Sequence, residues 1–173
     1  WSLSEEIHAL TVLNIEGQNK QLLGLGQYGQ GAVFEVTTSS QISQQYSIAV
    51  GLETALSQSN ATVTAIAHGA AGGGNNTLYV GTDRGLITGE TSTARGAFEP
   101  TWRFYYTPEV TPYPTAIDEL RSLSLGMVAN PAEVRTMALD GPTPNNAQVL
   151  WFGTPSGVHM MNLIDNSISH SGL

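Results

Sequence analysis

The sequence predicts an all-β protein assembled from three similar units. Its 173 residues include 19 glycines and only 12% charged residues, so that Ser, Thr, Asn and Gln supply most of the polar character. This composition is typical of short strands joined by many turns. The second observation is an internal repeat, in which an apolar strand is followed by a turn, a glycine and another strand. The repeat is clearest at residues 150–158 and 78–86, and a looser copy occupies residues 23–33.

We expect the first unit to span residues 1–55. Residues 3–7 are predicted to be a lead-in and residues 8–12 a mostly apolar innermost strand, followed by a polar turn. The remaining strands of the unit are expected at residues 23–28, 32–36 and 46–51.

The second unit is expected at residues 56–128. Its lead-in occupies residues 56–63, and a fourth, outer strand is predicted at residues 101–106, where aromatic residues alternate. The prolines of residues 108–114 exclude regular structure, and residues 117–123 are predicted to form a short helical turn. The other strands are expected at residues 63–67, 78–81 and 86–89.

The third unit is expected at residues 129–173. Strands are predicted at residues 134–139, 150–152 and 158–163, with a turn-rich loop after the first of them. No fourth strand is evident in this unit, so we expect it to be incomplete.

Four short antiparallel strands per repeat are the signature of a β-propeller blade. The points taken as equivalent, Ile7, Val63 and Val134, are separated by roughly 56 and 71 residues, which exceeds the ~40–50 residues of a typical blade. The excess is expected in the connections between the third and fourth strands, where insertions are tolerated because they lie on the surface. Three blades do not close a ring. We therefore expect the chain to be part of a longer propeller, and regard a homo-oligomer that completes the ring as the alternative.

The segments Leu150–Val158 and Leu78–Leu86 resemble the propeller repeat of the two-component-regulator type. In that repeat a strand ending in Gly-Thr is followed by a two-residue turn, a glycine and an aliphatic residue. The lead-ins at residues 3–7 and 56–63 are similar as well, whereas the first copy has Gln27 in place of the threonine and a longer turn. The resemblance implies an extracytoplasmic module, periplasmic or extracellular, of a larger sensor protein. Similar repeats also occur in lectins, enzymes and scaffolds.

Charge and composition exclude several classes of function. The net charge of -8 and pI near 4.7 disfavour nucleic acids and anionic membranes, because both need clustered Lys and Arg. The chain has no cysteine and no metal-type spacing of its four histidines, and no apolar run is long enough to insert into a membrane. Gly24, Gly26 and Gly29 match a dinucleotide fingerprint, but a strand rather than a helix is expected after them. We expect neither a metal nor a cofactor.

Two groups of residues are candidate ligand or partner contacts. Trp102, Arg103, Tyr105 and Tyr113 belong to a region rich in aromatic residues and proline, which would suit a protein partner or a sugar ring. The alternative, which we favour for the aromatic residues of the strand, is that they pack an outer strand on its neighbour.

His8 and Arg135 form the second group. Both are predicted to be the second residue of an innermost strand, so that blade symmetry would place them on the central channel of a propeller.

No catalytic motif is present, and we expect a non-enzymatic propeller for ligand sensing or protein-protein assembly. A carbohydrate-binding propeller is the alternative, although the three units do not repeat an aromatic and polar constellation. An enzyme that uses the propeller channel is a third hypothesis.

Overall fold

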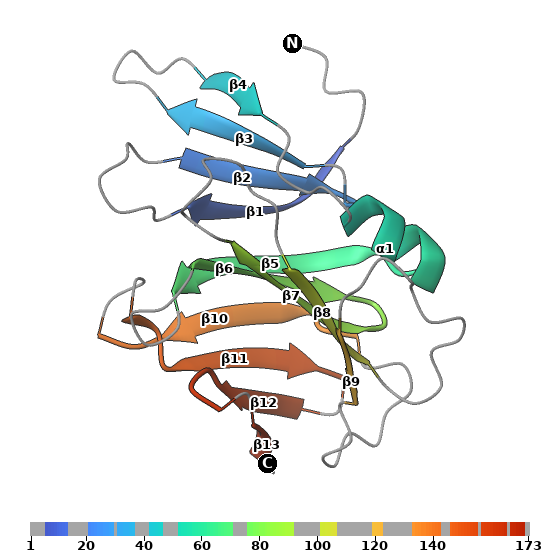
Figure 1. The fold of residues 1–173 in the computed structure, drawn as a ribbon, viewed down its shortest axis with the longest axis vertical. Helices are drawn as coiled ribbons and strands as arrows, with labels where there is room; N and C mark the ends of the chain where they lie inside the picture. Colours follow the sequence, from blue (N-terminus) through green and yellow to red (C-terminus); the bar gives the residue numbers. More distant parts are fainter. Residues whose placement is uncertain are drawn as a thin grey trace.

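The computed structural model of the chain describes residues 6–13, 21–29, 31–36, 42–46, 52–70, 76–91, 101–106, 119–122, 133–142, 146–155, 157–165 and 167–171. These residues form three β-sheets and one short helix (Figure 1). None of the three sheets closes on itself. The protein is therefore all-β in its architecture, as the sequence predicts.

The first sheet has the strand order β1-β2-β3-β4, with every neighbouring pair antiparallel. Its fourth strand is earlier in the chain than the expected residues 46–51, which except for residue 46 lie outside the described residues. The strands are β1 (Ile7–Leu13), β2 (Gln21–Gly26), β3 (Gly31–Val36) and β4 (Ile42–Tyr46).

The second sheet contains five strands in the order β5-β6-β7-β8-β9. The expected outer strand is β8, but it lies inside the sheet because β9 pairs with its other edge in parallel. The helical turn predicted at residues 117–123 is wrong, since residues 119–122 form β9. The strands are β5 (Val63–Ala70), β6 (Asn76–Thr82), β7 (Gly85–Thr91), β8 (Thr101–Tyr106) and β9 (Glu119–Ser122).

The third sheet is antiparallel throughout, in the order β10-β11-β12-β13. It has the fourth strand, β13, that was not evident from the sequence. The turn before β13 is held by Asn162 and Asp165, whose side-chain oxygens accept the backbone N–H groups two residues further on. The strands are β10 (Thr136–Asp140), β11 (Val149–Thr154), β12 (Gly157–Asn162) and β13 (Ile168–Ser171).

The helix α1 (Leu52–Ser59) connects the first and second sheets and was not predicted from the sequence. Its C-terminus is a Schellman motif, in which Asn60 has a φ of 50°. The N–H of Asn60 donates to the carbonyl of Ser57 at 3.3 Å, and that of Ala61 donates to the carbonyl of Leu56 at 2.9 Å. These bonds satisfy carbonyl groups at the end of the helix and turn the chain into β5.

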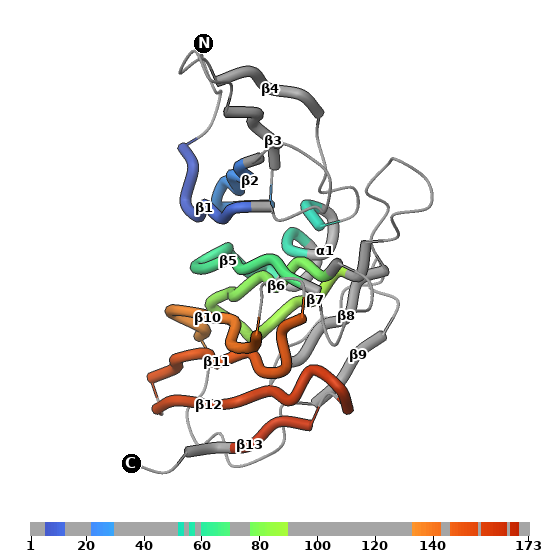
Figure 2. Tube along the Cα trace, turned by 90° about the vertical axis from the view of Figure 1, so that its left-hand side faces the viewer, coloured from blue at the N-terminus to red at the C-terminus, as the bar shows by residue number. Residues whose placement is uncertain are grey.

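The three sheets lie side by side and share a row of three strands. β5 packs against β1 on one side and β10 on the other. Viewed from the side in Figure 2, β1, β5 and β10 stand in one row, and the strands that follow each of them extend away from it in different directions. Each sheet consists of strands from one of the three units expected from the sequence.

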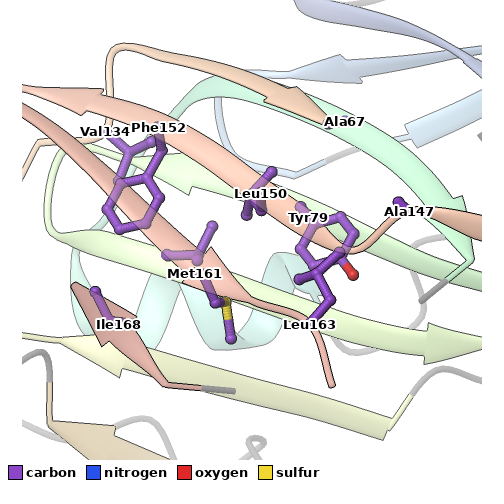
Figure 3. Packing of buried hydrophobic residues seen from close by; sticks show 10 residues of the cluster. Ala67, Tyr79, Val134, Ala147, Leu150, Phe152, Met161, Leu163 and Ile168 are labelled. Atoms are coloured by element: carbon purple, nitrogen blue, oxygen red, sulfur yellow. The ribbon is translucent and has the colours of Figure 1, made fainter. Parts of the chain in front are cut away.

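A hydrophobic core fills the space between the second and third sheets (Figure 3). The second sheet contributes Ala67, Tyr79 and Leu86, and the aromatic ring of Phe152 in β11 is 1% exposed. Tyr79 thus packs between the second and third units. The other buried members come from the third sheet and its flanking residues, and are Val134, Ala147, Leu150, Met161, Leu163 and Ile168.

Candidate functional site

A pocket of about 480 Å³ lies along the C-terminal halves of β1, β5 and β10, the three strands of the shared row. We call it the inner-strand pocket. Each of the three sheets contributes to its wall, and the loop after β10 completes it. Its lining residues are Thr11, Val12, Ile66, Ala67, His68, Met137, Ala138, Leu139, Asp140, Gly141, Pro142 and Ala147.

Strand register explains why these residues meet. One position of the innermost strand in each sheet pairs with a fully or almost fully buried leucine of the second strand, and that position lines the pocket in all three sheets. The pairs are Thr11 with Leu23, His68 with Leu78, and Leu139 with Leu150. The repeat thus places three different side chains, a hydroxyl, an imidazole and an isobutyl group, around one space.

His68 is the most unusual residue of the pocket. Its side chain is 4% exposed, and neither ring nitrogen has a hydrogen-bond partner among the described residues. Burial lowers the pKa of His68 from 6.5 to about 4, because the charged imidazolium loses its hydration in the interior. The ring is therefore neutral near pH 7 and offers one hydrogen-bond donor and one acceptor.

Among the described lining residues, two others carry polar side chains. Thr11 is half-buried in β1, and Asp140 is exposed at the end of β10. A carboxylate oxygen of Asp140 accepts a long hydrogen bond, 3.5 Å, from the indole N–H of Trp151. The pocket therefore combines an apolar wall with a neutral imidazole and one carboxylate, an arrangement suited to binding.

A second candidate site is the outer face of the third sheet, formed by Ala138, Val149, Trp151, Val158 and Met160. Register places these side chains together, because Trp151 pairs with Ala138 on one side and with Met160 on the other. Their neighbours in sequence, such as Phe152, point to the opposite face and into the core. All five are half-buried or exposed, with Val158 at 37%.

The matching face of the second sheet is covered. Ala67, Tyr79, Leu86 and Thr88 occupy the positions of Ala138, Trp151, Val158 and Met160 in the strand register. They are 8%, 3%, 0% and 4% exposed, respectively, because the third sheet packs over this side. The outer face of the third sheet is thus the counterpart of a buried interface.

The repeated Gly-Thr motif has a structural role. The Thr82 hydroxyl donates to the carbonyl of Gly85 at 2.9 Å and accepts the N–H of Arg84 at 3.1 Å. In the third sheet the Thr154 hydroxyl reaches the carbonyl of Gly157 at 3.4 Å. Gly85 and Gly157 have φ values of 146° and 126°, which L side chains rarely adopt.

His159 is a structural histidine. It is fully buried, its Nε2 lies 2.9 Å from the Thr154 hydroxyl, and its ring stacks on Phe152 with centroids 5.3 Å apart. His68 differs from His159, since it is buried without a partner among the described residues.

Three residues of the aromatic candidate group, Trp102, Arg103 and Tyr105, lie in β8 and pair with Gly89, Thr88 and Leu86 of β7. Tyr113 lies outside the described residues. The role of this group in binding a partner stays a prediction.

His8 and Arg135 are not among the residues that line the pocket. Both are exposed, and the Arg135 guanidinium pairs with Glu133 at 3.0 Å. They do not occupy equivalent places in the register, because β1 has a bulge at His8. Ile7 pairs with Gly26 as Thr136 pairs with Gly153, so His8 follows this position whereas Arg135 precedes it. A role for either residue in ligand contact stays a prediction.

Gly24 and Gly26 lie in β2, and the turn at Gly29 leads into β3, so the strand expected after this glycine pattern is confirmed. Within the described ranges, no three His, Asp or Glu side chains gather in a way that could hold a metal ion. The one helix of the described ranges is too short to cross a membrane.

Comparison with known proteins identifies no relative. No protein-family model matches the chain, and a search of curated proteins found no similar sequence.

Proposed function

We propose that this chain is a β-propeller module, non-enzymatic and extracytoplasmic, that senses a ligand or assembles with another protein. The observation that carries the proposal is the sheet-to-sheet arrangement, in which one row of innermost strands belongs to three successive sheets. Its extracytoplasmic placement has the repeat resemblance as its only support. The binding role is supported by the inner-strand pocket, where residues of all three sheets converge.

Contacts between successive units recur in a way that favours a propeller. The N–H of Val63 donates to the carbonyl of Gln27 at 2.9 Å, and the N–H of Val134 donates to the carbonyl of Thr82 at 2.8 Å. Gln27 and Thr82 occupy the same place in the repeat, directly after the motif glycine. The lead-in of each following unit is therefore attached to the turn of the preceding one, as a ring of blades requires.

The outer face of the third sheet is where such an array would continue. Its counterpart in the second sheet is buried by the next sheet, and the two faces share an aromatic residue at the centre, Tyr79 or Trp151. We propose that the outer face receives a further antiparallel sheet of the same kind, either from the remainder of a larger propeller or from a second copy of this chain. Apolar burial would drive the contact.

The solution mass of the chain, measured by light scattering across a concentration series, tests this proposal. We expect association through the exposed apolar face. Trp151→Glu should weaken it by at least about tenfold, because the new carboxylate would be buried without a partner. Ile164→Glu is the matched control, since Ile164 is 75% exposed in the turn before β13 and lies off this face.

Association that Trp151→Glu weakens and Ile164→Glu leaves unchanged supports the proposal. A chain that remains a stable monomer at all concentrations, or that responds equally to both substitutions, contradicts it.

A further inference from the structure

We propose that the inner-strand pocket binds a small amphipathic organic molecule, neutral or cationic, whose hydroxyl or amino group hydrogen-bonds to the imidazole of His68. This inference rests on the ligand-sensing part of the proposed function and names the class of ligand. It is independent of what covers the outer face of the third sheet.

The first argument is the size and polarity of the pocket. A volume of about 480 Å³ falls in the range of small-molecule sites, which are mostly apolar with a few polar groups. The wall is formed largely by aliphatic side chains, with Val12, Ile66, Met137 and Leu139 the largest of them. A ligand with an apolar body of the size of one aromatic ring and a short chain would be accommodated.

The second argument is His68 itself. Buried polar groups in folded proteins are nearly always hydrogen-bonded, because leaving one unpaired costs about 1–3 kcal/mol. Both nitrogens of His68 lack a partner among the described residues and are closed to solvent, and His68 is one of the residues that line the pocket. A turn of the ring toward the pocket would bring a nitrogen within reach of a ligand's hydroxyl or amino group, and the neutral ring both donates and accepts.

The third argument is charge. Among the described residues, Asp140 is the only charged one in the lining, and none of the described lining residues is Lys or Arg. The whole chain carries a net charge of -8. An anionic ligand would meet a carboxylate without a compensating cation, whereas a neutral ligand would not be repelled and an ammonium group would be attracted by Asp140.

Three probes of nearly equal size, each with a phenol group, separate the effect of the charge of the ligand. Tyramine carries a phenol and an ammonium group, 4-ethylphenol carries the phenol alone, and 3-(4-hydroxyphenyl)propionate carries a carboxylate in place of the amine. Each is titrated into the intact chain with labelled histidine, and the ring resonances of His68 are followed by NMR. The resonances are assigned by their loss in His68→Leu.

Tyramine and 4-ethylphenol should move the His68 resonances saturably, and the propionate should bind at least about tenfold more weakly than tyramine. His68→Leu, measured through the ligand resonances, should weaken tyramine binding by about tenfold through loss of the hydrogen bond. His8→Gln is the matched control, because His8 is an exposed histidine of β1 outside the lining, and it should bind as the wild type does.

Val12→Trp provides a second test of the pocket in case the His68→Leu variant fails to fold. Val12 is 41% exposed, so a larger side chain there is tolerated while it fills the pocket, and binding should be lost with circular dichroism unchanged. The proposal is overturned if neither tyramine nor 4-ethylphenol shifts the ring resonances of His68 at ligand concentrations up to about 10 mM. It is also overturned if His68→Leu and Val12→Trp bind tyramine as the wild type does. Because these readouts do not depend on association, they can fail while the propeller proposal stands.

Discussion

At the scale of single residues, His68 links the stability of the fold to the proposed ligand binding. An imidazole buried without a hydrogen-bond partner among the described residues destabilises the fold in the absence of a ligand. At the same register position the other sheets have Thr11 and Leu139, so the strand itself does not need a histidine there. The proposed binding role would account for the cost of burying this ring.

The stability of the protein should fall as the pH is lowered from about 6.5 to about 4. The unfolded chain takes up a proton on His68 below 6.5, whereas the folded protein keeps the ring neutral down to its lowered pKa of about 4. Unfolding therefore gains a proton in this window, and the full loss amounts to about 3 kcal/mol for this residue. Denaturant unfolding at pH 7, 5.5 and 4 measures it.

His68→Leu provides the comparison, because it removes the titrating group and keeps a side chain of similar volume. The difference in unfolding free energy between wild type and variant should change with pH across that window and be constant above it. A difference that stays the same from pH 7 to pH 4 would show that the ring is not buried in its neutral form. Asp140, the other titratable residue of the lining, is present in both proteins.

The sequence could predict some of these residues and not others. The threonine of the Gly-Thr motif was predicted to end a strand just before a turn, and its hydroxyl joins the strands on either side of that turn. His68 could not be selected from four histidines, because its importance depends on pairing with Leu78 and on the strands of two other sheets. A useful signal would have been the hairpin register, which places it opposite a buried leucine.

At the scale of elements, local patterns predicted strands better than their partners. The apolar strands around each Gly-Thr motif were found because alternation and turn residues are short-range signals. β9 and the inner position of β8 were missed, since a parallel partner more than ten residues away leaves no local pattern. The helix α1 was missed because its eight residues contain few large apolar side chains, the two leucines Leu52 and Leu56.

Those two leucines hold α1 against the first sheet. Both are fully buried, and a Cβ added at Gly29 would come within 2.7 Å of Leu56 Cδ1, so the helix lies directly on the turn after β2. Gly29 also has a φ of 84° and is strained for any other residue. α1 therefore contributes to the attachment of the second sheet to the first.

Leu56→Ala should destabilise the protein by about 2–5 kcal/mol, because it leaves a cavity between α1 and this turn. Ser57→Ala is the matched control on the same helix, since Ser57 is exposed, and its effect should stay within about 0.5 kcal/mol. Urea unfolding monitored by circular dichroism measures both. Equal effects of the two substitutions would mean that α1 is not packed on the first sheet.

At the scale of the whole molecule, the three sheets are joined by the same kinds of contact. β5 lies between β1 and β10, the lead-in of each later unit bonds to the preceding turn, and the core lies between neighbouring sheets. The repeat in the sequence could predict three units because each is a local pattern. Closure of a ring depends on the angle between sheets and on what covers the outer face of the third sheet, which no local pattern records.

Close approach between sheets should make Gly81 intolerant of a side chain. A Cβ at Gly81 would lie 2.8 Å from Val134 Cγ1 and 3.1 Å from the Val134 carbonyl, which belongs to the next unit. Gly81→Ala should therefore cost about 1–3 kcal/mol by pushing the second and third sheets apart. Gly153 is the equivalent glycine, but a Cβ there would meet only the Thr136 side chain, at 2.9 Å, and Thr136 is exposed and within the same sheet, so Gly153→Ala should cost less.

A double-mutant cycle separates this contact from general effects of alanine in a strand. Val134→Ala removes the methyl groups that the new Cβ would strike, so the two substitutions together should cost less than the sum of the single ones by about 1 kcal/mol. The rescue should be partial because the Val134 carbonyl remains in place. Combining Gly153→Ala with Val134→Ala should be additive. If Gly81→Ala and Val134→Ala were additive as well, the second and third sheets would not meet at this point, and the side-by-side arrangement that supports a propeller would be wrong.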